Sequence, residues 1–181
     1  MRKLKNEELN RISVEAFKDS EKSPIVIILD NVRSLHNIGS VFRTADAFRI
    51  ESICLCGITA CPPHREIHKT ALGATESVNW KYYPSALSAI EDLRMKGFII
   101  VALEQAEDST YLNDFEPIVD KKYAFVLGNE VMGVEDSVIE KSDLLLEIPQ
   151  FGTKHSLNIA VSAGMLIWDY YSKTKKNNIN F

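Results

Sequence analysis

The chain has 181 residues, of which 45% are hydrophobic and 25% charged, and its formal charge is -4 at neutral pH, which fits a single globular domain. Its apolar stretches are far shorter than the ~20 residues that a membrane span needs. The polar N-terminus lacks the apolar core of a signal peptide. We therefore expect a cytoplasmic protein without a membrane partner, and the negative charge argues against a generally basic, nucleic-acid-binding surface.

Apolar runs and turn residues predict alternating strands and helices after an N-terminal appendage, residues 1–23, that holds a short amphipathic helix at 6–18. Strands are expected at 24–29, 52–56, 77–82, 98–103, 123–127 and 144–148. Helices are expected at 38–48, 64–72, 84–96, 134–141 and 157–173. This order predicts one α/β domain, residues 24–173, with a mostly parallel six-stranded sheet flanked by helices. A polar tail at 174–181 follows.

Three segments place polar residues directly after predicted strands: 31–48, 125–134 and 148–160. In open α/β sheets, ligands bind at the carboxyl ends of the strands, so these turns are the candidate site. Any nucleic-acid contact would need a local basic patch, and the basic residues either form one or are scattered over the surface. The candidates are Arg33, His36, Arg43, Arg49, His64, Arg65, His68, Lys69, Lys154 and His155.

The second segment carries Gly128 and Gly133 on either side of Asn129 and Glu130. Glycine allows positive φ and a close approach of backbone to ligand, although strand-to-helix turns often use glycine without binding anything. The turn lacks the Lys-Ser/Thr pair of a phosphate-binding P-loop, and no G-x-G-x-x-G follows a strand. A Walker-type nucleotidase and a nicotinamide site are therefore not indicated.

Purely structural roles compete with function at several of these residues. Asn37 has the chemistry of a helix N-cap, and Ser156 is a better capping candidate than Asn158. Arg43 could form a surface ion pair with Asp46 at i+3, which would contribute little to stability.

A cluster of cysteines and histidines offers zinc-type donors, but we predict no metal. Structural zinc sites favour C-x2-4-C knuckles on loops, whereas buried cysteines in strands commonly fill cores. A metal-dependent hydrolase built on Glu130 and Asp136 would also lack paired carboxylates at metal-site spacing. The cluster consists of Cys54, Cys56, Cys61, His64 and His68.

Three ordered motifs carry a more specific signal. The first is formed by Asn31, Asn37, Gly39, Arg43, Ala45, Ala47 and Phe48. The second is formed by Leu127, Gly128, Glu130 and Gly133, and the third by Ile148, Pro149, Gly152, Ser156, Leu157 and Asn158. Together they resemble the SpoU (TrmH-like) family of RNA 2'-O-ribose methyltransferases in the SPOUT superfamily, over residues 25–171.

The resemblance implies that the C-terminal segment threads a loop to form a deep trefoil knot, usually within a homodimer. It also implies S-adenosylmethionine as cofactor. The cofactor-binding residues would be Leu103, Glu104, Leu127, Gly128, Ile148, Ser156, Leu157 and Asn158, and the catalytic set would be Arg43, Asn37, Glu130, Ser156 and Asn158.

Arg43 is the family's position for activating the ribose 2'-hydroxyl. A guanidinium is a poor base, so it suits orienting the hydroxyl and stabilising the developing alkoxide. The resemblance leaves open whether Arg43 serves its own site or the partner subunit's site. We expect tRNA as the methylated RNA, since the sequence lacks the separate N-terminal RNA-binding domain of larger relatives. The alternatives are an rRNA 2'-O-methyltransferase or a non-catalytic RNA-binding protein of the same fold.

Overall fold

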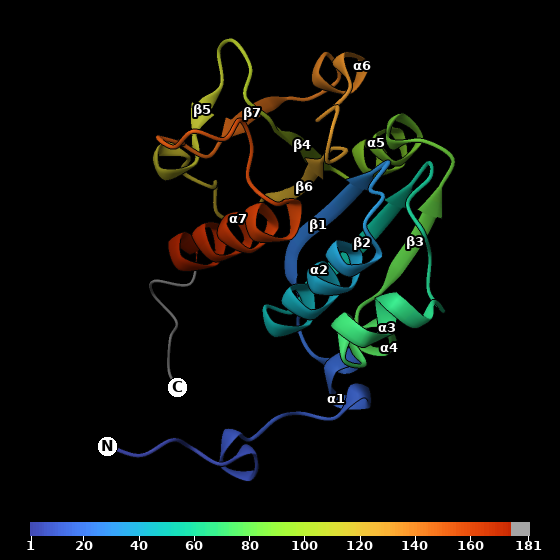
Figure 1. The fold of residues 1–181 in the computed structure, drawn as a ribbon, viewed down its shortest axis with the longest axis vertical. Coiled ribbons are helices and arrows are strands. Elements are labelled where there is room, and N and C mark those ends of the chain that lie inside the picture. The colour runs from blue at the N-terminus through green and yellow to red at the C-terminus, as the bar shows by residue number, and fades with distance from the viewer. Residues whose placement is uncertain (175–181) are drawn as a thin grey trace.

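The computed structural model describes residues 1–174 and shows one parallel sheet in the order β3-β2-β1-β6-β4-β7-β5 (Figure 1). The strands are β1 (Ser23–Asp30), β2 (Ile50–Cys56), β3 (Trp80–Tyr83), β4 (Phe98–Leu103), β5 (Thr110–Tyr111), β6 (Lys122–Leu127) and β7 (Leu144–Glu147). The α-helices are α1 (Val14–Asp19), α2 (Leu35–Ala47), α3 (Arg65–Ala71), α4 (Ala74–Ser77), α5 (Ala86–Met95), α6 (Asp136–Ile139) and α7 (Ile159–Thr174). Two 3₁₀ turns complete the set, η1 (Asn6–Leu9) and η2 (Leu112–Asp114).

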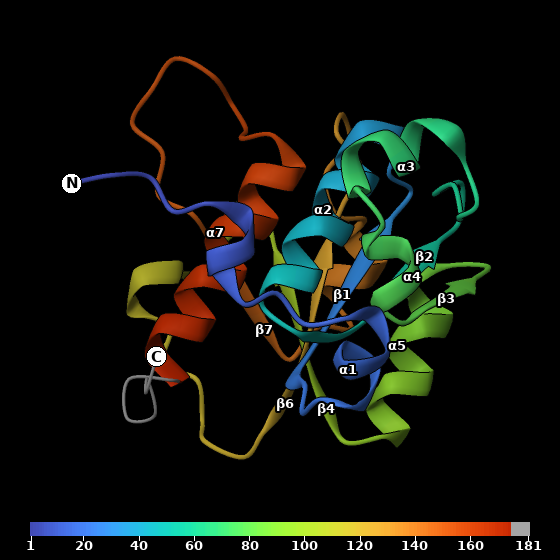
Figure 2. The same cartoon turned by 90° about the horizontal axis from the view of Figure 1, so that it is seen from below.

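The sheet is covered on both faces, as its continuous apolar strands predict. Alternate side chains of β1 enter two separate cores, because successive residues of a strand point to opposite faces. Ile25, Ile27 and Leu29 pack in a core that includes residues of α2, α3 and α7, whereas Val26 and Ile28 pack in a core that includes residues of α5 and α6. Figures 1 and 2 show α2 and α7 on the same side of the sheet.

The prediction of six strands is wrong by one, since the structure has a seventh, β5. β5 is two exposed residues long and pairs only with β7, so its sequence shows no apolar run. The single helix expected at 6–18 is also wrong. Asn10 adopts a left-handed conformation with φ of 47°, which ends η1 and separates it from α1. The short elements α4 and η2 were not predicted either, and the other elements differ from expectation only at their bounds.

The connection from β4 to β6 encloses β7. The chain leaves β4, forms β5 at the outer edge of the sheet, and returns through η2 to β6, which lies on the opposite side of β4. β7, which comes later in the sequence, occupies the place between β4 and β5. Among residues 1–174, no helix is long and apolar enough to cross a membrane.

Candidate functional site

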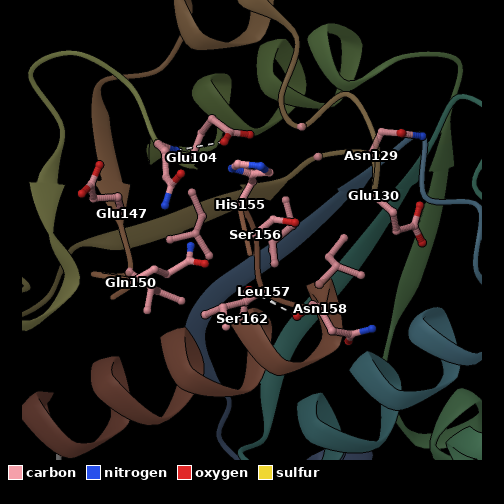
Figure 3. Close-up of a pocket in the computed structure, with 17 residues that line it drawn as sticks. Glu104, Asn129, Glu130, Glu147, Gln150, His155, Ser156, Leu157, Asn158 and Ser162 are labelled. Carbon is pink, nitrogen blue, oxygen red and sulfur yellow. Dashed lines mark hydrogen bonds between the residues drawn. The ribbon is translucent and has the colours of Figure 1, made fainter. Parts of the chain in front are cut away.

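The turns after β4, β6 and β7 line one cavity of about 290 Å³ beside the start of α7 (Figure 3). Parallel strands bring their carboxyl ends to one edge, which is why segments far apart in the sequence meet there. Glu130, Ser156 and Asn158 of the expected catalytic set line the cavity, whereas Asn37 and Arg43 do not. All eight residues expected to bind the cofactor line it: Leu103, Glu104, Leu127, Gly128, Ile148, Ser156, Leu157 and Asn158.

A hydrogen-bonded chain of side chains closes one end of this cavity. The Asn37 Nδ2 group donates to Glu130 Oε1 over 3.1 Å, and the Asn158 Nδ2 group donates to Asn37 Oδ1 over 3.1 Å. Asn37 therefore connects the second and third sequence motifs without lining the cavity itself. An asparagine can do this because its amide offers both a donor and an acceptor.

The Glu130 carboxylate also anchors the start of α2. It accepts hydrogen bonds from the backbone N–H groups of Arg33 and Ser34, both over 3.0 Å. Burial by itself raises the pKa of the Glu130 carboxyl, but these bonds and the one from Asn37 outweigh burial and leave the pKa below its ordinary value. Glu130 is thus held as an anion with its oxygens already bonded, which makes it an anchor and a poor proton acceptor.

The two capping expectations for these asparagines and serines are wrong. Ser34, not Asn37, caps α2, since the Ser34 side chain accepts from the Asn37 N–H. At α7, Asn158 rather than Ser156 takes the capping role, because Asn158 Oδ1 accepts from the Ala160 N–H over 3.0 Å. Asn158 therefore ties the helix start to Asn37 with its other amide atom.

The turn between β6 and α6 depends on close backbone contact at its base. Asn129 and Gly133 exchange two backbone hydrogen bonds of 2.9 Å, and a Cβ on Gly128 would lie only 2.2 Å from the Gly133 carbonyl. Gly133 has φ of 69°, and a Cβ at this position would collide with the Glu104 carboxylate. Glycine at both positions is therefore required by the fold of the turn itself, in addition to any ligand.

Glu104 holds this turn from the neighbouring strand. Its Oε2 accepts from the Val134 N–H over 2.8 Å and its Oε1 from the Gln105 N–H over 2.9 Å. Both carboxylate oxygens are thus engaged with backbone, which fixes the cavity wall between β4 and β6.

The long connection from β7 to α7 differs from the other turns of the cavity in its backbone hydrogen bonding. Within the described chain, residues 149–157 make no backbone–backbone hydrogen bond. Figure 2 shows this segment as a wide loop leading into α7. Its N–H and C=O groups are therefore available to a ligand or to water, unlike those of the ladders on either side.

Arg43 lies apart from this network. It is exposed on α2, and among residues 1–174 it has neither an ion-pair nor a side-chain hydrogen-bond partner. The expected surface pair with Asp46 is absent, since Asp46 instead accepts a hydrogen bond from Ser77. Within residues 1–174, no hydrogen bond therefore joins the Arg43 side chain to Asn37, Glu130 or Asn158.

Several residues that line the cavity were not among the expected site residues, although most are adjacent in sequence to one that was. Gln105 follows Glu104, and Ser162 lies one helical turn after Asn158, so adjacency and the i, i+4 spacing could have found them. The cavity residues outside the expected catalytic and cofactor-binding sets are Gln105, Asn129, Gly133, Glu147, Gln150, His155, Ile159 and Ser162.

No group of three or more metal-type ligands occurs in residues 1–174. Cys54 and Cys56 are buried in the same core beneath α5. Burial raises the pKa of the Cys54 thiol to about 12, and burial raises the pKa of Cys56 as well. Both side chains are therefore apolar core filling at neutral pH.

A model of the SpoU rRNA Methylase family matches residues 24–168. The chain belongs to this family. Among its SpoU-type relatives, it is 29% identical over 160 residues to a putative TrmH family tRNA/rRNA methyltransferase of Staphylococcus haemolyticus, covering 88% of this chain and 63% of the relative. It is 28% identical over 171 residues to the 23S rRNA (guanosine-2'-O-)-methyltransferase RlmB of Neisseria meningitidis, covering 94% of this chain and 66% of the relative.

The SpoU-family chain thus spans a little under two thirds of the length of these relatives. Its fold is similar to that of an AdoMet-bound rRNA methyltransferase from Sinorhizobium meliloti, with a TM-score of 0.77 and 26% identity, covering 86% of this chain and 59% of that one. It also matches the A. aeolicus TrmH/SpoU tRNA modifying enzyme with a TM-score of 0.76 and 23% identity over 90% of this chain and 80% of that one.

Proposed function

We propose that this protein is an S-adenosylmethionine-dependent RNA methyltransferase that transfers a methyl group to a ribose 2'-hydroxyl. The observation that carries the proposal is the cavity at the carboxyl edge of the sheet, where all three sequence motifs meet in one hydrogen-bonded arrangement. Family membership and the AdoMet held by the S. meliloti relative support it.

The cavity suits the chemistry of S-adenosylmethionine. Aliphatic side chains, including Leu103, Leu127 and Ile148, offer apolar walls to an adenine. The unbonded backbone of 149–157 offers donors and acceptors to the ring nitrogens and ribose. The carboxylates of Glu104 and Glu147 lie on the same cavity, where they can attract the cofactor's positive charge. When bound, the cofactor supplies an electrophilic methyl group.

In the proposed reaction, the chain itself positions the RNA and stabilises charge. The O2' atom of the ribose would form a bond to the methyl carbon while the bond from that carbon to the sulfonium sulfur breaks, which releases S-adenosylhomocysteine. The hydroxyl proton would pass to solvent water. Arg43 would orient this hydroxyl and stabilise the developing negative charge on O2'. Glu130 would not receive the proton, because its oxygens already accept bonds from Arg33, Ser34 and Asn37. Its role would be to fix α2, which carries Arg43.

We further propose a homodimer and a trefoil knot. The apolar surface of α7 supports the dimer, because Val161, Met165 and Trp168 are 52%, 41% and 58% exposed on one side of the helix. In a dimer, Arg43 could reach the partner's cavity, which would explain why it has no partner within its own chain. The passage of the chain around β7 supports the knot.

The experiment that tests the function is single-turnover transfer of a labelled methyl group from S-adenosylmethionine to purified tRNA and rRNA. The expected product is a 2'-O-methylated nucleotide, which resists alkaline cleavage, in tRNA first and rRNA second. The control is the same RNA with a 2'-deoxynucleotide at the mapped position, which should accept no label. Calorimetry should show cofactor binding at one site per chain. A folded protein that binds cofactor and RNA yet transfers nothing would be a non-catalytic RNA-binding protein.

A further inference from the structure

A second cavity, of about 500 Å³, lies on the other side of α3 from α2 and shares no residue with the candidate methyl-transfer site. It is formed where the loop before α3 faces the start of β3. Its walls are mainly apolar: Pro62, Pro63, Ile67 and Trp80. Nothing in the proposed methyl transfer uses it.

The walls suit a flat aromatic ligand. Trp80 is half-buried at the first position of the edge strand β3, with part of its ring packed against the core. Pro62 and Pro63, which line the same cavity, have no backbone N–H and fixed φ, so they form a rigid apolar surface. An indole and an apolar wall that enclose a space are the elements with which proteins bind unstacked bases.

The rim carries one cation, Arg65, and two imidazoles. His64, Arg65 and His68 line the cavity and are exposed, and within residues 1–174 none of them forms an ion pair. Beside them, the Glu66 carboxylate pairs with Lys69 over 2.7 Å and with His36 over 3.3 Å. Lys69 therefore offsets the negative charge of Glu66. On a chain with a net charge of -4, this rim stands out as a place where a phosphate would be attracted.

One carboxylate, Glu76, also lines the cavity. An acidic side chain would repel a phosphate, but it accepts hydrogen bonds from the amino group of a base, as carboxylates do with cytosine. Guanine presents two neighbouring N–H donors and could satisfy one carboxylate with both. A cation for the RNA backbone, Arg65, and an acceptor for a base edge, Glu76, thus occur around the same apolar space.

We propose that this cavity binds an unstacked nucleobase of the RNA substrate, one with an amino group on its pairing edge. The proposal rests on the proposed function only in naming RNA as the ligand. The base stacks on Trp80, its edge faces Glu76, and its phosphate lies near Arg65.

The cavity is rigidly coupled to the candidate site through α2. A Cβ on Gly39 would lie 2.0 Å from Thr70 Oγ1 and 2.4 Å from the Ile67 carbonyl oxygen, so α2 and α3 are in backbone contact there. Thr70 Oγ1 also donates to the His36 carbonyl over 3.2 Å. α2 carries Asn37 and Arg43, so a base held beside Ile67 would fix the RNA relative to both.

The test uses the fluorescence of Trp80. Trp80 and Trp168 are the two tryptophans of the chain, so the Trp168→Phe variant reports on Trp80 alone. We expect guanosine and cytidine monophosphates, and short single-stranded oligonucleotides, to quench it in a saturable way. Uridine monophosphate should quench less, and ribose 5-phosphate should have no effect. Equal quenching by ribose 5-phosphate would overturn the assignment of a base, and no quenching by any nucleotide or oligonucleotide would overturn the proposal.

Variants test the contribution to RNA binding. Trp80→Leu should weaken RNA affinity by roughly tenfold, the order expected for one stacked base, while cofactor affinity stays unchanged. Arg65→Gln should weaken RNA binding and reduce its salt dependence. The matched control is Tyr82→Leu, an exposed aromatic on the same strand that does not line the cavity. A Trp80→Leu protein that folds and binds RNA like Tyr82→Leu would contradict the proposal.

Two outcomes separate this proposal from the proposed function. If nucleotides quench Trp80 but the protein methylates no RNA, the base site stands and the proposed methyl transfer is refuted. If Trp80→Leu leaves methyl transfer unchanged at limiting RNA, the methyl transfer stands and the base site is overturned. A change in Trp80 fluorescence with protein concentration in the absence of RNA would assign the cavity to a second copy of the chain and overturn the base site.

Discussion

Arg43 combines an exposed guanidinium with the lack of any ion-pair or hydrogen-bond partner in the described chain. If Arg43 orients the ribose and stabilises charge during transfer, Arg43→Ala should leave folding and cofactor affinity intact while the transfer rate falls at least ~100-fold. Arg43→Lys should not restore the rate, because an ammonium lacks the planar fork. The measurement is single-turnover transfer with cofactor affinity determined in parallel.

The control for this experiment is Arg11→Ala, which removes an exposed arginine that precedes α1. It should transfer methyl groups at nearly the native rate. A near-native rate for Arg43→Ala, on an RNA that the native protein methylates, would remove Arg43 from the mechanism.

Asp30, at the end of β1, predicts a pH-dependent stability. It is only 2% exposed, and burial, followed by the charge of Glu135, raises the pKa of Asp30 to about 6. The folded pKa thus lies above the unfolded value of about 3.9, so the folded protein holds the extra proton. Stability should fall as pH rises from about 4 to about 6, and stay lower above that.

Asp30→Asn should therefore be more stable than the native protein at pH 7.5, by about 2 kcal/mol, and equal to it near pH 4. The amide oxygen can still accept the 3.0 Å bond from Asn31. Urea unfolding across this pH range measures the difference, with the exposed Asp136→Asn as control. A constant difference between Asp30→Asn and native protein at all pH values would contradict the ionisation argument.

At the residue scale, the sequence predicted which side chains line the cavity, but it did not predict which hydrogen bonds these side chains form. Strand ends and ordered motifs identify Glu130 and Asn158, because the local sequence shows which residues directly follow a strand or begin a helix. The link through Asn37 joins residues 93 and 121 positions apart. Such pairings depend on the packed arrangement of α2 against the sheet, which no local pattern contains.

At the scale of elements, Lys173 fixes the end of α7 to the connection that surrounds β7. Its Nζ donates to the carbonyls of Leu112 over 2.9 Å and Phe115 over 2.7 Å, and it pairs with Asp169 over 2.8 Å. The Lys173 side chain is 12% exposed, so these groups have little access to water.

Lys173→Met should lower the free energy of unfolding by about 2–4 kcal/mol, because it leaves a carboxylate and backbone carbonyls without their donor. Adding Asp169→Leu should recover part of the loss, since the unpaired charge is then removed. Urea unfolding of the single and double variants measures this. A Lys173→Met protein as stable as the native one would show that the tie contributes nothing.

The elements that sequence predicted well are those with a clear physical period. The apolar runs of β1, β4 and β6 are buried on both faces and were found almost to the residue. The elements that were missed form through tertiary contacts: β5 exists only because β7 lies beside it. Likewise, Val161 and Met165 are exposed on α7, because apolar residues occur all around that helix and its sequence does not mark a single buried face.

At the scale of the whole molecule, the exposed face of α7 predicts association of two copies. Trp168 extends this surface through aromatic contacts with Tyr171 and Phe48. Trp168→Glu should convert the dimer to a monomer at micromolar concentration, as a charge there would lose its water on association. Sedimentation measures the change. Met95→Glu is the control, since Met95 is 82% exposed on α5 at the opposite face of the sheet, and a native protein that sediments as a monomer would refute the dimer.

The sequence predicted the type of sheet, parallel and covered by helices, but not the order of its strands. Alternation of strands and helices does not specify which strands become neighbours. The place of β7 between β4 and β5 is a property of the whole chain. The resemblance implied a knot near the C-terminus but did not specify this position of β7.

That placement has a consequence for how the protein is made. Chains leave the ribosome from the N-terminus, and domains begin to fold as they emerge. β5 pairs only with β7, which is synthesised more than thirty residues later. Until then, the connection from 104 to 121 must stay open on the nascent chain, with a vacant position beside β4. β7 follows every other described strand in the sequence, so the strand that completes the interior of the sheet is made after all its neighbours, together with the turn that lines the cavity.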